Sequence, residues 1–354
     1  MIATTATLAR RVSAMAANRN LHSAKSSRKD EFYTQLSDIE NELRHYTEHF
    51  RGKVVYCNCD DPRVSNFFKY FSLNFARLGL KKLITTCYKN QQMDMFSKHD
   101  AEKAIYLEYD GTVNENGVPS IEDIGIHPLQ GDGDFRSDEC IMLLKYADIV
   151  VTNPPFSLFR EYVAQLMAYD KQFLIIGHQN AITYKEIFPL IKENRIWLGY
   201  GPMGKDMLFD VPEDYARYLV DNKNEGSAYR MVNGVVKGRL GNAAWYTNLD
   251  HNRRHEDLIL YKKYTPEDYP TYDNYDAIEV SKTKEIPCDY AGAMGVPISF
   301  LDKHNPEQFE IVSANDIRLN DRVPIKKHGL IKDKDGTING KPKYVRIVIR
   351  NKRL

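Results

Sequence analysis

Asp148-Ile149-Val150-Val151-Thr152-Asn153-Pro154-Pro155-Phe156-Ser157 is the stretch of sequence that decides the fold. Residues 149–151 are β-branched and apolar, which predicts a short strand covered on both faces. Two prolines end that strand, because neither has a backbone N–H to donate to a neighbouring strand. Pro154 also drives Asn153 toward an extended conformation. The sequence therefore places an asparagine and then an aromatic ring at the carboxyl end of a buried strand, where ligands bind in open α/β sheets.

The chemistry of this corner follows from its donors and acceptors. The amide of Asn153 offers an acceptor oxygen, and Pro154 offers a free carbonyl. Two acceptors side by side can take both hydrogens of an exocyclic amino group, which leaves its nitrogen lone pair more available. Phe156 offers a flat face on which a purine or pyrimidine can stack. The structural alternative is a strand followed by an ordinary Pro-Pro turn. The aromatic residue directly after the prolines favours instead a site that activates the amino group of a planar base.

Several stretches carry a resemblance to a known family. The Asn-Pro-Pro-Phe run resembles the motif of the amino-methyltransferases that use S-adenosylmethionine. The chain also resembles the EcoRI-type adenine-specific DNA methyltransferases in Asp30–Gln35, Val54–Phe68, Gly131–Arg136, Met294–Ile298 and Asn305–Phe309. This likeness extends from Asp30 to the C-terminus and is weakest between Gly201 and Gly241. It implies an α/β, Rossmann-like methyltransferase fold: a mainly parallel twisted sheet with helices on both faces, DNA-recognition insertions and a C-terminal region.

The resemblance also implies roles for individual residues. The catalytic residues it implies are Asn153, Pro154, Pro155 and Phe156. The residues it implies for S-adenosylmethionine are Tyr33, Thr34, Asn58, Asp60, Asp61, Pro62, Asp132, Asp134 and Phe135. For Tyr33 and Thr34, the alternative is a helix entry held by an aromatic. Either Asp60 or Asp61 would contact amino or ribose groups of the cofactor, while the other caps a helix.

The turn at Gly131–Phe135 has a rival interpretation. Asp132 and Asp134 would help to hold the adenine of the cofactor, with Phe135 stacked on it. They could instead bind a metal ion, but no further carboxylate or histidine accompanies them at EF-hand spacing. The five cysteines form no paired zinc pattern, and their odd number suits reduced thiols in a cytoplasm. We therefore expect no metal.

Composition limits the class of protein. The chain has 354 residues, of which 42% are hydrophobic, so it can form one large α/β domain with an added region, or two domains. Its mean hydropathy is −0.52, and no apolar run approaches the ~18 residues that a membrane helix needs. We expect a cytoplasmic monomer with no membrane association.

Charge is distributed unevenly along the chain. Residues 1–29 contain six Lys or Arg and no acid, and residues 326–354 contain ten Lys or Arg against two Asp. Because the whole chain carries +1, residues 30–325 carry −13. Two basic ends on an acidic body predict an anionic polymer as partner, although basic tails can also serve solubility alone. The candidate DNA-binding residues are Arg10, Arg11, Lys25, Arg28, Lys29, Lys205, Arg239, Arg346 and Arg350.

The pattern of elements suggests three regions. We expect residues 1–29 to form a mobile basic arm and residues 30–262 to form the catalytic domain. We expect residues 263–354 to form a C-terminal region that contributes to DNA recognition. Residues 200–242 contain many glycines and cations without clear periodicity, which predicts an irregular DNA-facing loop. Smaller expectations are a hairpin formed by 104–109 and 118–124, a late strand at 258–261, and an edge strand at 344–350.

The expected function is site-specific methylation of adenine N6 in duplex DNA, with GAATTC as the candidate site. The setting would be restriction–modification, with or without a restriction endonuclease that cuts the same site and forms no complex with it. The alternatives are methylation of an RNA base, methylation of a protein glutamine, and a catalytically silent DNA-binding relative. The basic ends favour nucleic acid over a peptide, and the intact Asn153–Phe156 run opposes the silent relative.

Overall fold

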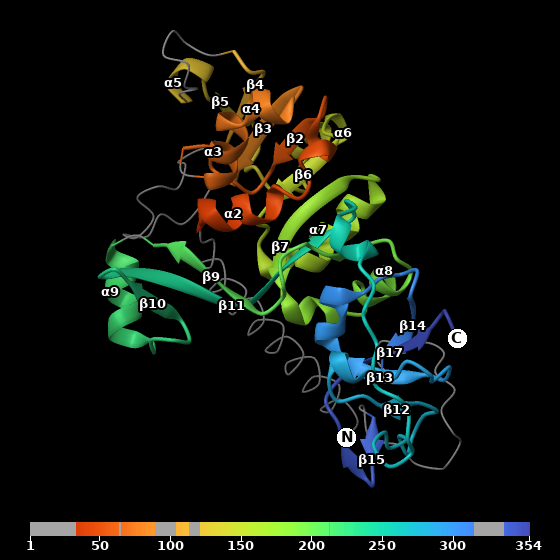
Figure 1. The fold of residues 1–354 in the computed structure, drawn as a ribbon. Helices are drawn as coiled ribbons and strands as arrows, with labels where there is room; N and C mark the ends of the chain where they lie inside the picture. The colour runs from red at the N-terminus through yellow and green to blue at the C-terminus, as the bar shows by residue number, and fades with distance from the viewer. Residues whose placement is uncertain (1–32, 64, 89–103, 113–120, 212, 315–335) are drawn as a thin grey trace, which may run out of the picture.

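The computed structural model describes residues 33–63, 65–88, 104–112, 121–211, 213–314 and 336–354. The protein is a mixed α/β structure with one large sheet, which runs in the order β1-β9-β11-β7-β6-β2-β3-β4-β5, and a smaller C-terminal sheet (Figure 1). Two short strands, β8 (Trp197–Leu198) and β10 (Tyr229–Val232), pair with β11 beside this path.

The centre of the large sheet is parallel. Its strands are β7 (Gln172–His178), β6 (Ile149–Thr152), β2 (Val54–Cys57) and β3 (Lys82–Cys87), in that order. Strand β2 comes first in the sequence, with β3 on one side and β6 on the other. The chain therefore leaves β2 toward one side and later continues on the other, which makes the β2–β6 boundary the point where the strand connections diverge.

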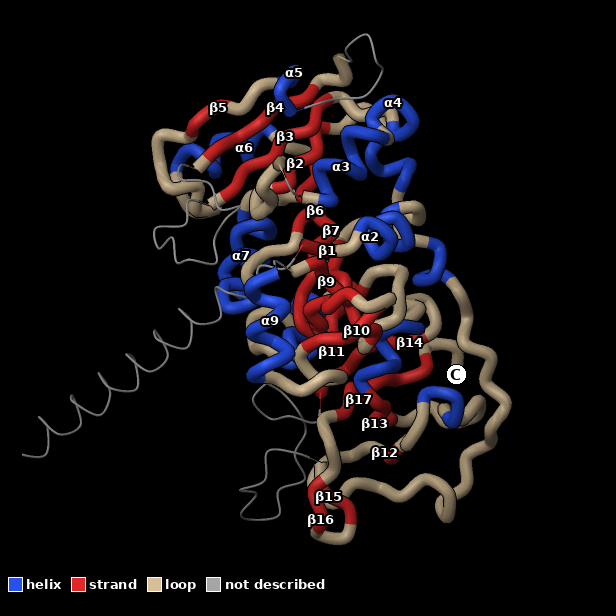
Figure 2. The backbone as a smooth tube through the Cα atoms, turned by 90° about the vertical axis from the view of Figure 1, so that its left-hand side faces the viewer, coloured by secondary structure: helices blue, strands red, loops and turns tan. Residues whose placement is uncertain are grey.

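Both faces of these strands are buried, as continuous apolar runs predict. Val54, Tyr56 and Val150 pack on one face with helices α6 (Asp138–Tyr146), α7 (Phe159–Ala168) and α8 (Phe188–Lys192). Val55 and Val151 pack on the other with helices α2 (Leu36–Leu43), α3 (Asn66–Leu73) and α4 (Phe75–Leu78). Figure 2 shows the strands between α6 and α7 on one side and α2, α3 and α4 on the other.

One flank of the sheet differs from the sequence-based expectation. Strand β4 (Ile105–Tyr109) pairs antiparallel with β3, and β5 (His127–Pro128) follows it. Residues 121–124 form helix α5 (Ile121–Ile124), so the predicted hairpin of 104–109 with 118–124 is wrong. The reason is that β4 finds its partner in the large sheet, where Leu107 and Tyr109 become buried.

The other flank carries an arm where an irregular loop was expected. It consists of β9 (Lys205–Asp210), helix α9 (Glu213–Asn222), β10 and the long β11 (Val235–Thr247). These elements project together to one side in Figure 1. Asn233 and Gly234 connect β10 to β11 with φ of 51° and 78°, the two positive φ angles that a two-residue hairpin turn requires. The irregular loop is wrong because the arm's strands take their order from pairing with each other and with β7.

The C-terminal region forms a four-stranded sheet in the order β12-β13-β17-β14. Its strands are β12 (Ile278–Glu279), β13 (Met294–Pro297), β14 (Phe309–Ala314) and β17 (Arg346–Asn351), and β15 (Thr337–Ile338) pairs with β16 (Lys341–Pro342) nearby. Strand β17 has partners on both sides, so the predicted edge strand at 344–350 is wrong. Residues 258–261 form no strand. Ile347 and Ile349 belong to the same apolar core as α7 and α8.

Short 3-10 helices connect these elements. They are η2 (Thr47–Phe50), η3 (Phe156–Leu158), η4 (Gln179–Thr183), η5 (Asn252–His255), η6 (Thr283–Glu285) and η7 (Ile298–Lys303). No helix in the described part of the chain is both long enough and apolar enough to cross a membrane.

Candidate active site

The Asn-Pro-Pro-Phe run lies at the carboxyl end of β6, as predicted. Thr152 and Pro154 are buried, whereas Asn153, Pro155 and Phe156 are partly exposed. Beyond the prolines the chain turns into η3, where the N–H of Leu158 donates to the carbonyl of Pro155 over 3.0 Å. The ring of Phe156 packs at the margin of the core on the α2–α3 face. The strand thus holds an amide and an aromatic ring at the sheet edge on a backbone that the prolines restrict.

Asp60 connects this corner to the loop after β2. The hydroxyl of Thr152 donates to Asp60 Oδ2 over 2.6 Å, and the hydroxyl of Ser65 donates to Oδ1 over 3.0 Å. The backbone N–H of Asp60 donates to the carbonyl of Thr86 in β3. Burial raises the pKa of Asp60 to about 6, against the two hydroxyl hydrogen bonds, which favour the ionised form. The loop, the catalytic strand and β3 are therefore fixed to one another through one carboxyl group.

The raised pKa of Asp60 predicts a pH-dependent gain in stability for Asp60→Asn. The folded protein binds this proton more tightly than the unfolded chain, so the fold loses stability as pH rises from the ordinary pKa of 3.8 through the folded pKa of about 6. The difference from the ordinary value of 3.8 amounts to about 3 kcal/mol at most. Thermal unfolding of both proteins across this range should show the variant's higher Tm at neutral pH and a gap that closes in acid. A gap that does not change with pH would contradict the assignment.

Asp61 has a different role from Asp60. Its carboxylate accepts from the backbone N–H of Arg63 and from the Arg63 guanidinium, at 2.9 and 3.1 Å. Its carbonyl accepts from the N–H of Ser65, and Ser65 in turn caps helix α3 through Phe67 and Phe68. Pro62 is buried between them. Asp61 and Pro62 therefore shape the loop, whereas the cap comes from Ser65, which the sequence interpretation had not considered.

Asn58 lies at the base of the same loop, and its side chain is buried. The hydroxyl of Tyr162 in α7 donates to Asn58 Oδ1. Asn58 Nδ2 is buried and has no partner among the described residues. The ring of Phe135 meets that of Tyr162 edge-on, with centroids 5.0 Å apart. Phe135 is only 5% exposed, so its ring is part of the wall behind the loop.

Tyr33 and Thr34 form strand β1 (Tyr33–Thr34) and lie beside helix α3. The carbonyl of Thr34 accepts from Asn66 Nδ2 over 2.7 Å. Thr34 Oγ1 is buried without a partner among the described residues. Strand β1 pairs antiparallel with β9 of the arm. The structure thus brings this pair next to the Asp60 loop, and it also connects the pair directly to the arm.

The turn at 131–135 packs against the carboxyl end of β3. Gly133 has a φ of 75°, and a Cβ atom there would collide with the carbonyl of Cys87. Asp134 accepts from the backbone and guanidinium of Arg136, and Asp132 accepts from the N–H of Asp134 over 3.0 Å. Within the described residues, no group of three or more His, Cys, Asp or Glu side chains is arranged to hold a metal ion. The close approach of Gly133 to Cys87 holds the turn against the end of β3, the strand beside β2.

The predicted DNA-binding residues are dispersed. Arg239 forms two 2.6 Å hydrogen bonds with Asp206 of β9, and Arg346 is bound by the buried Glu279. Arg350 is exposed on β17. Lys205 begins β9. The remaining candidates, which are Arg10, Arg11, Lys25, Arg28 and Lys29, lie outside the described residues.

Glu42 is a structural anchor that the sequence interpretation missed. It is 2% exposed, and its carboxylate accepts from the N–H groups of Tyr200 and Gly201 at 2.6 and 2.7 Å. It also accepts from the hydroxyl of Tyr46 over 2.8 Å. Burial raises the pKa of Glu42, against these hydrogen bonds. Glu42 thereby fixes the segment that leads into the arm; a glutamate within an apolar helix face was its only signal.

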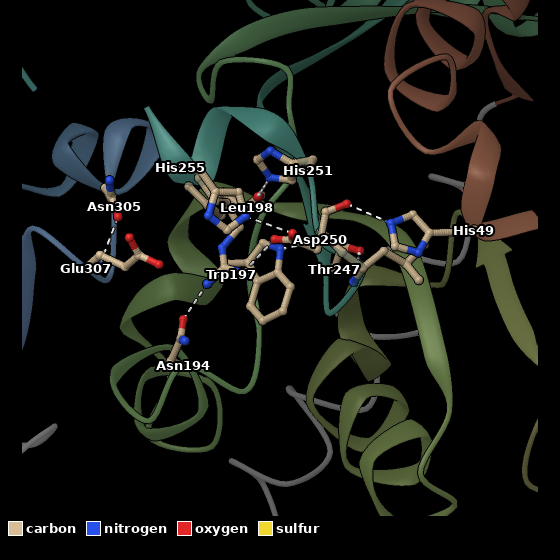
Figure 3. Close-up of polar contacts among 12 residues, drawn as sticks. His49, Asn194, Trp197, Leu198, Thr247, Asp250, His251, His255, Asn305 and Glu307 are labelled. Atoms are coloured by element: carbon tan, nitrogen blue, oxygen red, sulfur yellow. Dashed lines mark hydrogen bonds and ion pairs between the residues drawn. The ribbon is translucent and has the colours of Figure 1, made fainter. Parts of the chain in front are cut away.

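Figure 3 shows a second polar cluster around Asp250 and Trp197. In the register of β7 with β11, it lies at the opposite end of these strands from Asn153. The guanidinium of Arg254 lies 3.5 Å from the centre of the Trp197 ring and pairs with Asp250 over 3.1 Å. The Asp250 carboxylate also lies 2.8 Å from His255 Nε2, and the backbone carbonyl of Asp250 lies 2.8 Å from His49 Nε2. The cluster therefore connects η5, just before the C-terminal region, to η2 and β8.

Comparison with known proteins identifies the family of the chain. The family model described as "Adenine-specific methyltransferase EcoRI" matches residues 20–352. The chain is 54% identical to "Type II methyltransferase M.EcoRI" of Escherichia coli, over 96% of this chain and 98% of that one. It is 38% identical to "Type II methyltransferase M.MpnI" of Mycoplasma pneumoniae, over 93% and 97% of the two chains. No solved structure matched. The chain belongs to the EcoRI family of adenine-specific methyltransferases.

Proposed function

We propose that this protein transfers a methyl group from S-adenosylmethionine to the N6 amino group of adenine in duplex DNA. The observation that carries the proposal is the hydrogen bond from Thr152 to Asp60, which joins the Asn153 corner to the loop after β2. The order of the four parallel strands supports a Rossmann-like fold, in which ligands occupy the crevice where the connections diverge.

The residues around the loop fit S-adenosylmethionine. Asn58 Nδ2, which is buried and has no partner within the described part of the chain, can donate to the cofactor, and Thr34 Oγ1 offers a second polar contact. Asp60 would accept from amino or hydroxyl groups of the cofactor in addition to its two hydroxyl partners, and the 131–135 turn would lie beside it. When bound, the cofactor supplies a methyl group on a sulfonium, which is already an activated leaving group. Positioning by the protein therefore accounts for most of the catalysis.

Asn153 and Pro154 act on the target amino group. An adenine paired inside a duplex is out of reach, so it must be flipped out, at a cost of a few kcal/mol. The Asn153 side-chain oxygen and the Pro154 carbonyl then accept its two amino hydrogens, which orients the nitrogen lone pair toward the methyl group. No charged base is required before the methyl transfer, because the proton leaves from the positively charged product nitrogen.

Substitution of Phe156 tests the stacking role. Phe156→Tyr and Phe156→Trp keep a flat face and should retain activity. Phe156→Ala should lose about 1–3 kcal/mol of base stacking, which would appear as a rise in KM for DNA and a fall in kcat/KM. Thermal unfolding of each variant separates this loss from destabilisation of the partly packed ring. Equal activity of the Ala and Tyr variants would exclude stacking as the role of Phe156.

The DNA contacts that we propose combine the basic ends with the arm. Arg350 is exposed and available to phosphate, and Lys205 begins the arm beside the sheet edge. Arg239 and Arg346 would have to exchange their carboxylate partners, Asp206 and Glu279, for phosphate. We therefore assign them a smaller share than Arg350 and the five N-terminal cations. We expect one protein molecule per site and a cytoplasmic location, where the DNA is.

Removal of residues 1–29 tests the N-terminal contribution. The segment carries six positive charges and no acid, so it should contact phosphate and not base edges. Its deletion should weaken binding to cognate and scrambled duplexes alike and make log Kd less dependent on salt. Sequence preference should persist. Loss of cognate affinity alone, with the salt dependence unchanged, would show that residues 1–29 read the DNA sequence.

Transfer of a labelled methyl group to duplex DNA, RNA and protein in parallel tests the substrate class. The DNA substrates should include a duplex with GAATTC, which the family resemblance favours, and a duplex of the same composition in another order. We expect label in adenine N6 of the first duplex. Label only in RNA or in protein glutamine would replace the proposal with one of those alternatives, and label in none would indicate a silent relative.

A further inference from the structure

His178 lies at the end of β7, beside the catalytic corner. In the parallel pairing of β6 and β7, the last pair is Thr152 opposite Ile175, so β7 continues from there to His178 at the same carboxyl edge where the chain leaves β6 as Asn153. Side chains alternate along a strand, so His178 is on the face of Leu174 and Ile176. Those two residues belong to the core against which Phe156 packs. The His178 ring and the Phe156 ring are therefore on the same side of the sheet edge.

A hydrogen bond determines which ring nitrogen of His178 carries the proton. The backbone N–H of Asn180 donates to His178 Nδ1 over 3.0 Å, and a backbone N–H can only donate. Nδ1 must therefore hold its lone pair, which leaves Nε2 as the protonated nitrogen of a neutral ring. Burial also lowers the pKa of His178, which favours the neutral ring. The ring is partly exposed, and it offers one N–H donor at Nε2.

The backbone beneath the ring is held in place. The hydroxyl of Tyr246 donates to the carbonyl of His178 over 3.0 Å. A Cβ atom on Gly177 would lie 2.5 Å from the ring of Phe159, so glycine is required for this close packing. Because this backbone is already fixed, the Nε2–H of His178 can orient a ligand with little further loss of conformational entropy.

We propose that His178 contacts the target base, donating its Nε2–H to a ring nitrogen of the flipped adenine. The inference rests on the proposed function and goes beyond it by adding a residue that fixes the rotation of the base on Phe156. The acceptor is N1 or N7, the two acceptor nitrogens nearest the amino group. With that nitrogen held, the amino group can face Asn153 and Pro154 in only one way.

The alternative is that His178 only caps η4 through Nδ1. Two variants separate the roles. His178→Asn keeps an acceptor near the position of Nδ1 and lacks the distal donor, so it should cap η4 and retain the wild-type Tm. His178→Gln can place an amide N–H near the position of Nε2 but caps poorly. A base contact predicts that Gln is more active than Asn, whereas a cap alone predicts the reverse.

The decisive experiment measures single-turnover methylation of duplexes that carry adenine, 1-deazaadenine or 7-deazaadenine at the target. Wild-type enzyme should lose about tenfold with one of the two analogues, as expected for one hydrogen bond. His178→Asn should lose a similar factor with adenine and show no further loss with that analogue. Binding to a duplex with an abasic target should be equal for both proteins, since the contact is to the base.

The outcomes that overturn the inference are specific. Equal use of both deaza analogues and adenine by the wild-type enzyme would exclude the ring contact. Full activity of His178→Asn would leave His178 as a cap. Asn153→Ala in the same assay keeps the proposals distinguishable: if that variant remained active, the proposed amino activation would fail, whatever His178 did.

Discussion

Asn153→Ala is expected to lower turnover by about 100- to 1000-fold, the loss observed when one preorganised partner of a transition state is removed. The side-chain oxygen accepts one of the two amino hydrogens, and Pro154 alone cannot orient the nitrogen lone pair. Since the interaction strengthens as the nitrogen becomes a nucleophile, the loss should fall on kcat more than on KM. Single-turnover methyl transfer to a cognate duplex gives the measurement.

The controls for this variant follow from where Asn153 lies. The cofactor contacts that we propose come from the loop after β2 and from β1, so cofactor affinity by calorimetry should remain near that of the wild type. Asn153→Asp retains an acceptor oxygen and should retain part of the activity. Turnover near the wild-type value in Asn153→Ala would refute activation by the amide.

Glu42→Ala is expected to reduce the free energy of unfolding by about 3–5 kcal/mol. The substitution leaves the N–H groups of Tyr200 and Gly201 and the hydroxyl of Tyr46 without their acceptor in a buried place. Each unsatisfied buried donor costs about 1–3 kcal/mol, offset here by the desolvation of the carboxylate itself. Chemical denaturation with unchanged m-value would give the difference in stability.

A second readout locates the effect of Glu42. Because Glu42 holds the segment leading into β9, its loss should loosen the arm first, and amide hydrogen exchange should accelerate in 200–211 before it does in β2 or β6. Glu42→Gln retains one acceptor oxygen and should fall between Ala and the wild type. An alanine variant as stable as the wild type would show that the buried carboxylate contributes nothing net.

The part of the fold nearest the catalytic corner could be predicted from sequence because local rules and burial agree there. The β-branched run before Asn153 forms β6 almost as expected, and the prolines stop it. The loop after β2 was located without a glycine-rich turn, although its cap is Ser65 and not Asp61. The sequence predicts Asn153 and Asp60 as site residues independently of each other. Their connection through Thr152 is a tertiary contact, so no local sequence pattern predicts it.

The arm and the C-terminal sheet were mispredicted for a shared reason. Strands such as β9 and β10 acquire order from partners far along the chain, and their own residues show little alternation. Strand β17 showed alternation, which suggested one buried face and a free edge. In the structure Val348, between Ile347 and Ile349, is also buried, because β17 lies inside its sheet with both faces covered. Likewise, Arg346 finds a buried partner in Glu279, a pairing that sequence distance concealed.

The shared core determines which parts of this enzyme can be exchanged between relatives. Ile347 and Ile349 of β17 and Phe309 and Ile311 of β14 pack into the same cluster as Phe188 of α8. A chimera cut at the end of the large sheet would therefore have to match two halves of one hydrophobic core. The arm is the more separable module, because it begins and ends in adjacent sheet strands. Evolution or engineering of new sequence specificity should accordingly proceed more readily by grafting residues 205–240 than by replacing the C-terminal region.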